Sequence, residues 1–422
     1  MKFDTPKNPN YAAQIVSVKA IVDIPKRDRI VSLPLFGYNA VVQKGWQVGD
    51  LGVFIPAEAQ LSEEYARENN MFRHQELNAD PGVKGYLEDN RRVKALKLGS
   101  ERSNALFMPL SSLAFTGVNI GELKEGDTFE SINGHEIVRK YQLRQPKEAS
   151  TKGNQPPKTR RVEERMFPQH IDTDNYWRNE HKIDPGTFVT VTQKLHGTSI
   201  RIGNTLVTRK LTLRERLAKR LGAAVQELSF ENVYGSRRSI KDANDPDQQH
   251  YYKDDIWTLE GRKLDGMIPE GFVVYGELIG WTPDGSPIQK GYTYRIPKGE
   301  ARLYVYRVTY VNPSGIVTDL SWTQVEQFSR NLGLNTVPLL WQGYKRDFDV
   351  EQWMNKRYGD VMARVVPLDD NGTVDEGVVV RAEGLTPRLL KAKSPDFFEY
   401  ETKMLDEGVE DLESKESFEL AG

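Results

Sequence analysis

Charged residues interrupt the apolar, strand-like runs in the second half of this chain, and this pattern restricts its fold more than any other feature. Lys194 follows the run FVTVTQ, Glu277 lies within VVYGELIG, and Glu376 precedes three valines in EGVVVR. Lys391 and Lys393 lie in LLKAKS and point the same way, because a strand alternates its faces. Charges at the ends of apolar strands are unfavourable unless they face a cleft. Several charges of both signs therefore indicate a polar site lined by strands.

The residue types in this set favour nucleotidyl transfer to a lysine. Lysine attacks phosphorus only as the neutral amine, and with an intrinsic pKa of ~10.4 less than about 0.1% is neutral at pH 7. Nearby cations, such as Lys391, Lys393 or a metal, would favour that form. Glu277 and Glu376 would hold Mg²⁺ or Mn²⁺ against phosphates. Schiff-base chemistry fits less well, since it needs neither twin carboxylates nor a phosphate clamp.

Each motif is weak when it is taken alone. An isolated lysine in a strand is usually a solvated surface residue, and Lys194 is open to that interpretation. The order Lys, Glu, Glu, Lys-x-Lys, with every member in a strand, is much more specific. The chain has no GxxxxGK[ST] loop and no GxGxxG after a strand, so a nucleotide would not be held in either of those ways.

The strand and helix patterns predict two folded regions. Residues 11–140 are rich in short strands punctuated by Gly and Pro, which is typical of a small barrel such as an OB-fold or of another small β domain. Residues 141–165 are basic and contain prolines, and predict an extended linker that either binds nucleic acid or is simply solvated. Residues 166–404 mix helix and strand and predict an α+β domain built on antiparallel sheets. Residues 405–422 are acidic and predict a frayed or disordered end.

One predicted helix stands out within the α+β region. Leu213, Leu217, Leu221 and Val225 recur at helical spacing beside a basic face. This pattern predicts an amphipathic helix with one basic side.

Composition limits the partners and the chemistry. The formal net charge of the 422 residues is −2, so any affinity for nucleic acid must come from local basic patches. The absence of cysteine excludes disulfides, thiol catalysis and Cys-based zinc sites. No apolar run approaches the ~20 residues of a membrane span, and the N-terminus lacks an apolar signal core. We therefore expect no membrane partner and a cytoplasmic location, or the host cytoplasm if the protein is phage-encoded.

Six short motifs follow one another along the chain: KLHGT, GSR, YGELIG, YVYR, EGVVVR and KAKS. This order resembles the signature of covalent nucleotidyltransferases, which include ATP-dependent ligases and mRNA capping enzymes. Within them the chain looks closest to RNA ligases, because His196 and Ser199 stand where DNA ligases typically carry Asp and Arg. Two further stretches resemble the Deinococcus and phage RNA ligases with an N-terminal OB domain, namely MFPQHIDTDN and ERLAKRLG…VYGSRRSIK. The resemblance spans roughly residues 11–400. It implies an OB-like barrel over 1–140, followed by a nucleotidyltransferase (adenylation) domain over 166–404.

The resemblance also implies a role for each matching charged position. Lys194 would be the residue that ATP adenylylates. Lys391 and Lys393 would contact the α-phosphate and help to expel pyrophosphate. Glu376 would bind a metal ion, Mg²⁺ or Mn²⁺, and Glu277 would contact the ribose or the metal.

The nucleotide-binding positions implied by the resemblance are Gln193, Gly197, Ser199, Arg237, Glu277 and Tyr306. Arg237 would contact the nucleotide and the reacting ends, with Arg238 and, less strongly, Arg209 as rival assignments. Tyr306 would stack on adenine, whereas Tyr304 is more typical of a core residue. Gln193 replaces a common Glu and would still accept a hydrogen bond through its carbonyl oxygen. Ser199 replaces an Asn that is common in nick-sealing relatives.

These roles imply an ATP-dependent RNA ligase that acts in RNA repair as a monomer. It would seal 3′-OH/5′-phosphate ends of RNA or RNA/DNA duplexes, most naturally nicks with RNA at the 3′-OH side, through lysyl-AMP and 5′-adenylylated nucleic acid. The alternatives are an ATP-dependent DNA ligase, a GTP-dependent capping-type guanylyltransferase and a non-catalytic nucleic-acid-binding relative. His196, Ser199 and the lack of an obvious C-terminal OB domain oppose the first.

Overall fold

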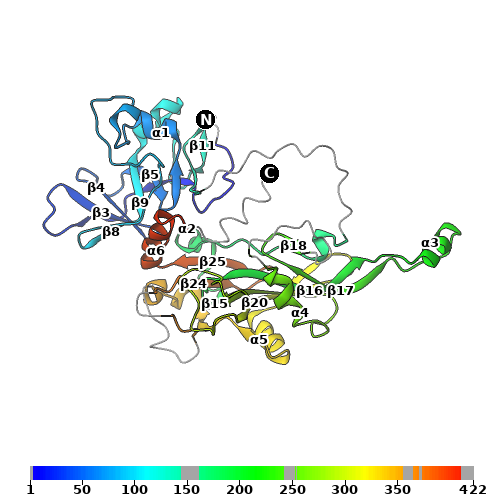
Figure 1. Cartoon of the computed structure of the whole chain (residues 1–422). Coiled ribbons are helices and arrows are strands. Elements are labelled where there is room, and N and C mark those ends of the chain that lie inside the picture. The colour runs from blue at the N-terminus through cyan, green and yellow to red at the C-terminus, as the bar shows by residue number, and fades with distance from the viewer. Residues whose placement is uncertain are drawn as a thin grey trace. The chain divides into compact units, whose positions relative to one another are not determined.

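The chain divides into two compact units (Figure 1). The N-terminal unit comprises Met1–Gln145, Asp174–Glu180 and Lys393–Glu410, and the second comprises Pro146–Thr173, His181–Ala392 and Asp411–Gly422. The computed structural model describes residues 3–143, 161–241, 252, 254–354, 365–369 and 373–409. Most of the predicted linker and of the predicted acidic tail lies outside the described residues. Those two predictions, like the domain boundaries, stay predictions.

Short antiparallel strands build the N-terminal unit. One four-stranded sheet has the order β10-β1-β5-β9, a three-stranded sheet has the order β2-β3-β4, and β11-β12, β13-β6 and β7-β8 form pairs. The strands are β1 (Ala13–Ser17), β2 (Val22–Asp23), β3 (Ile30–Leu35), β4 (Tyr38–Gln43), β5 (Leu51–Pro56), β6 (Ala59–Leu61), β7 (Leu96–Leu98), β8 (Glu101–Ser103), β9 (Ala105–Pro109), β10 (Thr128–Phe129), β11 (Ser131–Ile132), β12 (His135–Glu136), β13 (Val138–Lys140) and β14 (Asp174–Asn175). The helices are α1 (Glu63–Glu68), α2 (Tyr176–Asn179) and α6 (Pro395–Asp406).

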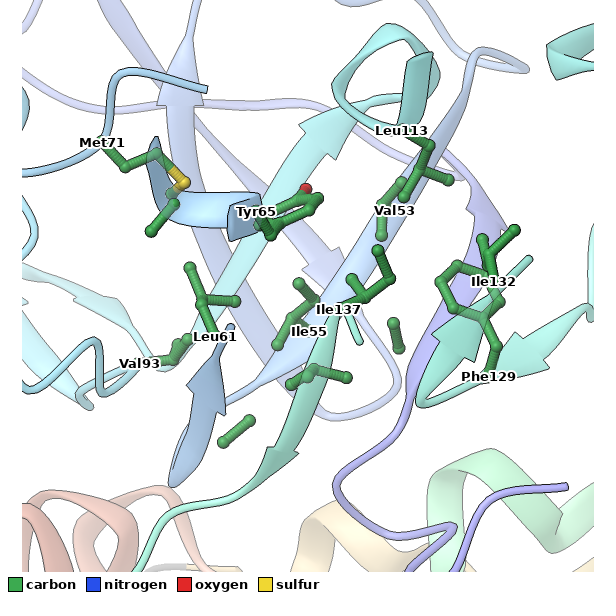
Figure 2. Close-up of a cluster of buried hydrophobic side chains, with 14 of the residues drawn as sticks. Val53, Ile55, Leu61, Tyr65, Met71, Val93, Leu113, Phe129, Ile132 and Ile137 are labelled. Atoms are coloured by element: carbon green, nitrogen blue, oxygen red, sulfur yellow. The ribbon is translucent and has the colours of Figure 1, made fainter. Parts of the chain in front are cut away.

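An apolar cluster forms the core of this unit. Figure 2 shows side chains of β5 such as Val53 and Ile55 beside Tyr65 of α1. The ring of Tyr65 is fully buried, and its hydroxyl donates a hydrogen bond to Ser112 Oγ at 2.9 Å. Ser62 begins α1 by accepting a hydrogen bond from the main-chain N–H of Tyr65, which directs this ring into the core.

The N-terminal unit confirms a β-rich fold but not a closed OB-like barrel. Its described strands fall into separate small sheets, and no path of paired strands closes on itself. A barrel requires every strand to be bonded on both sides. The predicted OB-like barrel is therefore not confirmed.

A polar group is buried inside the N-terminal unit at the β5–β6 turn. The side chain of Glu58 is 6% exposed and accepts a hydrogen bond from Thr402 Oγ1 at 2.7 Å. Nη1 of Arg92 lies 3.6 Å from its other oxygen. Burial and, to a smaller extent, the nearby Glu401 raise the pKa of Glu58 to about 7, and Arg92 only partly offsets them. The protonated carboxyl is thus the form that this environment favours.

This environment predicts a pH-dependent stability that Glu58→Gln removes. A raised pKa stabilises the fold fully below about pH 4.5, and this contribution is lost as the pH rises through about 7. It amounts to at most about 3 kcal/mol. Because glutamine cannot ionise, the variant should lose less stability than the wild type between pH 5 and pH 8, measured by urea unfolding. Identical pH profiles would contradict the prediction.

Two largely antiparallel sheets form the second unit, which confirms the predicted α+β class. One has the order β25-β24-β15-β23 and the other has the order β18-β17-β16-β19-β20-β21, with β22 beside β20. Their strands are β15 (Phe188–Gln193), β16 (Thr198–Thr208), β17 (Leu228–Gly235), β18 (Ile240–Lys241), β19 (Phe272–Gly280), β20 (Ala301–Val311), β21 (Val317–Asp319), β22 (Asn335–Thr336), β23 (Leu339–Tyr344), β24 (Gly377–Ala382) and β25 (Arg388–Lys393). The helices are α3 (Leu213–Arg220), α4 (Ile256–Arg262) and α5 (Trp322–Asn331).

The register of the second sheet aligns two predicted site positions, Ser199 and Glu277, with Tyr304. Ser199 on β16 faces Glu277 on β19, and Glu277 in turn faces Tyr304 on β20. Directly opposed residues project from the same face of a sheet. The β19–β20 ladder shifts register between Tyr275 and Gly276, which pair with Arg307 and Val305, so Tyr306 sits at a bulge.

The predicted amphipathic helix exists, but its leucines do not face a core. Figure 1 shows α3 at the far end of the β16–β17 hairpin. Leu213, Leu217 and Leu221 are 82%, 59% and 80% exposed. Thr212 and Glu215 begin the helix with a capping box. Nowhere in the described part of the chain is a helix both long and apolar enough to cross a membrane.

Candidate active site

β15 carries Lys194 to the point where the chain leaves the first sheet. Val189 and Val191 of this strand are fully buried, and β15 is bonded on one side to β23 and on the other to β24. The main-chain N–H of Lys194 continues the ladder by donating to the carbonyl of Gly377 at 2.9 Å. The chain then turns and enters β16 at Thr198. A strand held on both edges therefore fixes the backbone of Lys194.

The side chain of Lys194 is not solvated in the manner of a surface lysine. It is 14% exposed, and its Nζ lies 2.7 Å from Oε1 of Glu376, which is itself 3% exposed. Nδ1 of His196 lies 3.4 Å from the other oxygen of Glu376. A close carboxylate favours the charged ammonium. Lys194 would therefore have to leave this ion pair and lose a proton before acting as a nucleophile.

Glu277 ties the second sheet to the loop that carries Lys194. Its Oε1 accepts a hydrogen bond from the N–H of Gly197 at 3.0 Å, and its Oε2 accepts one from Ser199 Oγ at 3.3 Å. A Cβ on Gly197 would lie 2.1 Å from the carbonyl oxygen of Leu278. Only glycine allows this close approach of the loop to β19.

Tyr294 supports the same loop from outside the predicted motifs. Its hydroxyl oxygen accepts a hydrogen bond from the N–H of His196 at 2.7 Å. Burial, together with the nearby carboxylates of Glu376, Asp375 and Glu277, raises the pKa of Tyr294 well above its ordinary value. Tyr294 therefore stays protonated among these acidic groups.

The carboxamide of Gln193 is engaged within the chain. Its Nε2 donates to Asp375 Oδ1 at 2.9 Å and to the carbonyl of Val366 at 3.3 Å, while its Oε1 accepts from the N–H of Val366 at 3.1 Å. The residue is 2% exposed. In this structure Gln193 joins the 365–369 segment to the strand that precedes Lys194.

Arg237 and Tyr306 both contact the 167–173 segment. Arg237 lies in the turn between β17 and β18, and its Nη2 donates to Asp172 Oδ1 at 3.0 Å, with Arg238 3.7 Å from the same oxygen. The hydroxyl of Tyr306 lies 2.6 Å from Nδ1 of His170. The segment thus links two side chains that are far apart in the sequence.

Tyr304 lies in different surroundings from Tyr306. It contributes to the lining of a cavity of about 440 Å³ between α5, β22 and residues 365–367. Tyr306 instead packs partly buried against an apolar cluster that includes Phe167 and Tyr275. Tyr304 is therefore open to a small cavity and is not the enclosed core residue that the sequence suggested.

β25 carries the two lysines of the KAK motif. Ala392 between them is fully buried, while Lys391 and Lys393 are half-buried, as strand alternation predicts. Lys393 groups with the N-terminal unit, where its Nζ donates to Glu401 Oε1 on α6 and lies 5.2 Å from the centre of the Phe397 ring.

A model of the RNA ligase family matches residues 187–393, which run from the start of β15 to the end of β25. This domain belongs to the RNA ligase family. No curated protein sequence matches the chain.

Solved structures of an RNA ligase from Naegleria gruberi share the fold. The structure with pyrophosphate has a TM-score of 0.58 at 16% identity and covers 93% of this chain and 98% of that chain. A variant with ATP and manganese also has a TM-score of 0.58 at 16% identity, over 92% and 98%. Another variant, with AMP and manganese, has a TM-score of 0.57 at 16% identity, over 92% and 98%.

The predicted site residues of the RNA ligase domain fall into four groups. Hydrogen bonds, an ion pair and the loop backbone join Lys194, Gly197, Ser199, Glu277 and Glu376. Gln193 is connected to Asp375, next to Glu376, and Arg237 and Tyr306 are held by the 167–173 segment. Lys393 contacts α6, and Lys391 lies on β25 beside β24.

Sequence reasoning did not single out several residues that shape this RNA ligase site. Asp375 directly precedes Glu376, and that adjacency was an available signal. His170 and Asp172 lie in MFPQHIDTDN, a stretch that attracted attention only for its resemblance. Tyr294 acts through a long-range hydrogen bond that no local pattern reveals.

Glu277 and Glu376 of the RNA ligase domain fit a divalent cation by their chemistry. Carboxylate oxygens are the hard ligands that Mg²⁺ and Mn²⁺ prefer, and both side chains are largely buried. No group of three or more His, Cys, Asp or Glu is arranged as a metal site among the described residues. Two carboxylates would then share the ion with phosphate and water oxygens, which is usual for Mg²⁺.

Proposed function

We propose that this chain is an ATP-dependent RNA ligase that joins 3′-OH and 5′-phosphate ends, with Lys194 as its nucleophile. The observation that carries the proposal is the enclosed Lys194, paired at 2.7 Å with Glu376 inside the family-matched domain. The ATP, AMP and pyrophosphate in the Naegleria structures support the choice of nucleotide. The preference for nicks in duplexes with RNA at the 3′-OH side rests on the family resemblance.

The reaction would proceed in three displacements at phosphorus. Lys194 Nζ, once deprotonated, bonds to the α-phosphorus of ATP while the bond to pyrophosphate breaks. The 5′-phosphate of the nucleic acid then attacks the lysyl-AMP, which frees Lys194 and forms a 5′-5′ pyrophosphate linkage. Finally the 3′-hydroxyl attacks the 5′-phosphorus, AMP leaves, and the hydroxyl proton passes to solvent. Positioning and charge neutralisation are the main contributions of the protein in such displacements.

The other site residues would bind and orient the reactants. Lys391 and Lys393 would neutralise charge on the α-phosphate. Glu277 would contact the ribose, and it would share Mg²⁺ or Mn²⁺ with Glu376. When bound, that ion would withdraw charge from the phosphates. Arg237 would contact the nucleotide and the reacting ends with its planar fork of donors.

The substrate would be gripped mainly through its phosphates. The N-terminal unit, for which an OB-like fold remains our proposal, the basic stretch at 141–165 and the basic side of α3 are the candidates. Contacts to 2′-hydroxyls would distinguish RNA from DNA.

A substrate panel separates this function from its rivals. Nicked duplexes with RNA or DNA on the 3′-OH side would be incubated with ATP or GTP, and sealing followed on denaturing gels. The proposal expects ATP-dependent sealing only of RNA-ended nicks. Equal sealing of all-DNA nicks would favour a DNA ligase, and labelling by GTP alone would favour a capping-type enzyme. A folded chain that forms no adduct with either nucleotide would leave a non-catalytic binding protein.

Tyr306 and Tyr304 can be distinguished as the adenine-stacking residue. Base–aromatic stacking contributes about 1–3 kcal/mol, so Tyr306→Ala should raise the KM for ATP about 5- to 150-fold. Tyr306→Phe keeps the ring, removes the hydroxyl and with it the contact with His170, and should leave the KM nearly unchanged. The rate of AMP adduct formation at increasing ATP concentration measures both. If Tyr304→Ala shows the larger effect, the stacking residue is Tyr304.

A further inference from the structure

Arg201 is a buried arginine of β16 that the proposed reaction does not use. It is 1% exposed, and its guanidinium donates to three main-chain carbonyls. Nη1 donates to Phe167 at 2.8 Å, Nε to Ser236 at 3.1 Å and Nη2 to Arg238 at 3.0 Å. Burying a cation is unfavourable unless its donors are satisfied. Because burying this charged side chain is unfavourable in itself, its three satisfied hydrogen bonds indicate a specific structural role.

Neighbouring residues leave space for this side chain. Gly235 pairs with Arg201 across the β16–β17 ladder, and a Cβ there would lie 2.9 Å from Arg201 Nε and 2.7 Å from the carbonyl oxygen of Ser239. The guanidinium carbon lies 4.6 Å from the centre of the Phe167 ring, within the range of a cation–π contact. Glycine on one side and an aromatic ring on the other thus enclose the guanidinium.

The carbonyls that Arg201 binds lie on either side of Arg237. Ser236 and Arg238 are its chain neighbours, so both flanks of Arg237 are fixed to β16. The third carbonyl belongs to Phe167, at the start of the segment whose Asp172 accepts a hydrogen bond from Arg237 at 3.0 Å. One guanidinium therefore fixes both the backbone of Arg237 and the segment that holds its side chain.

We propose that Arg201 is a positioning residue that holds Arg237 in the orientation needed to contact the nucleotide and the reacting ends. The inference rests on the function proposed for Arg237. Arginine suits the task because its rigid fork donates in several directions at once. Lysine at this position would supply one ammonium on a flexible stem and would not span the three carbonyls.

A double-mutant cycle tests whether Arg201 acts through Arg237. Arg201→Lys and Arg237→Ala would be made singly and together, and the sealing rate of a pre-adenylylated RNA nick measured. Arg201→Lys should slow sealing about tenfold or more in the wild-type background and less than about threefold when Arg237 is already alanine. An equal slowing in both backgrounds, or none in the wild type, would overturn the proposal.

Arg381→Lys is a matched control for general destabilisation. Arg381 of β24 is 3% exposed and donates to Glu383 at 3.0 Å and to the carbonyl of Leu320 at 2.6 Å. Its replacement disturbs a comparable buried arginine in the other sheet and should leave the sealing rate within about threefold of wild type. If Arg201→Lys does not fold, Gly235→Ala displaces Arg201 without removing its charge and should slow sealing in the same direction.

Amide hydrogen exchange separates failure of this inference from failure of the ligase function. In Arg201→Lys, residues 167–172 and 235–239 should exchange faster together, whereas in Arg381→Lys they should exchange as in the wild type. A wild-type chain that forms no AMP adduct would end the ligase proposal, and the exchange result would still show whether Arg201 restrains both segments. Unchanged exchange in both segments would overturn the restraint itself.

Discussion

Lys194→Ala is expected to form no AMP adduct with ATP and Mg²⁺. The wild-type chain, shown to be folded and not already adenylylated, should gain the mass of one AMP in the absence of nucleic acid. The variant removes the only atom that would form the bond, so the loss should be complete and not partial. Intact mass spectrometry measures both chains side by side.

Two further variants make this result interpretable. Lys19→Ala replaces a lysine that is 67% exposed and paired with Glu125 in the N-terminal unit, and it should keep the full adduct. A pre-adenylylated nick offered to Lys194→Ala bypasses the first step, so sealing of that nick should persist. An AMP adduct on the folded Lys194→Ala chain would show that another residue is the nucleophile.

Gly197→Ala is expected to reduce both stability and adenylylation. The new Cβ would meet the carbonyl oxygen of Leu278 at 2.1 Å and Ile279 Cγ2 at 2.7 Å. Main chain cannot give way as a flexible side chain does, so the loop and β19 must move apart. Overpacking of this kind costs about 1–3 kcal/mol, and urea unfolding of the variant should show a loss in that range.

The same displacement should slow adenylylation about 100-fold, because a shift near 1 Å at a reacting group costs about that much. The N–H of Gly197 donates to Glu277 at 3.0 Å, so this contact would be lost with the movement. Gly384→Ala is the matched control: the nearest atom to its Cβ would lie 3.5 Å away, and both properties should be retained. A fully stable and active Gly197→Ala would show that the loop has room the structure does not reveal.

The charged interruptions of the strands predicted which charged side chains the fold brings together. Lys194, Glu277 and Glu376 lie in strands or directly beside them and come together as expected, because a buried strand leaves few places for a charge. Strand alternation also placed Lys391 and Lys393 on one face. These inferences depended on the alternation of residues along each strand, and this alternation is the same in the sequence and in the folded strand.

Other features depend on contacts between distant segments, and no local pattern encodes them. Arg201 occupies a strand position that would suit a solvated arginine, and its burial follows only from the approach of Phe167 and the turn after Gly235. Gln193 was expected to bind the nucleotide, and the contacts of its carboxamide with Val366 and Asp375 could not be read from the local sequence. The predicted closure of the N-terminal strands into a barrel likewise depends on pairing between strands that are distant in the sequence, and it was not confirmed.

The isolated position of α3 has a practical consequence for engineering the chain. The helix is held by its own capping box and by the pair between Arg209 and Glu215, while its leucines contribute little to any core. A segment with so few tertiary contacts unfolds locally at little cost to the rest of the domain. Exposed tips of this kind tolerate insertions best. The turn after Leu221 is therefore where the chain should accept an inserted peptide or reporter with the smallest loss of stability.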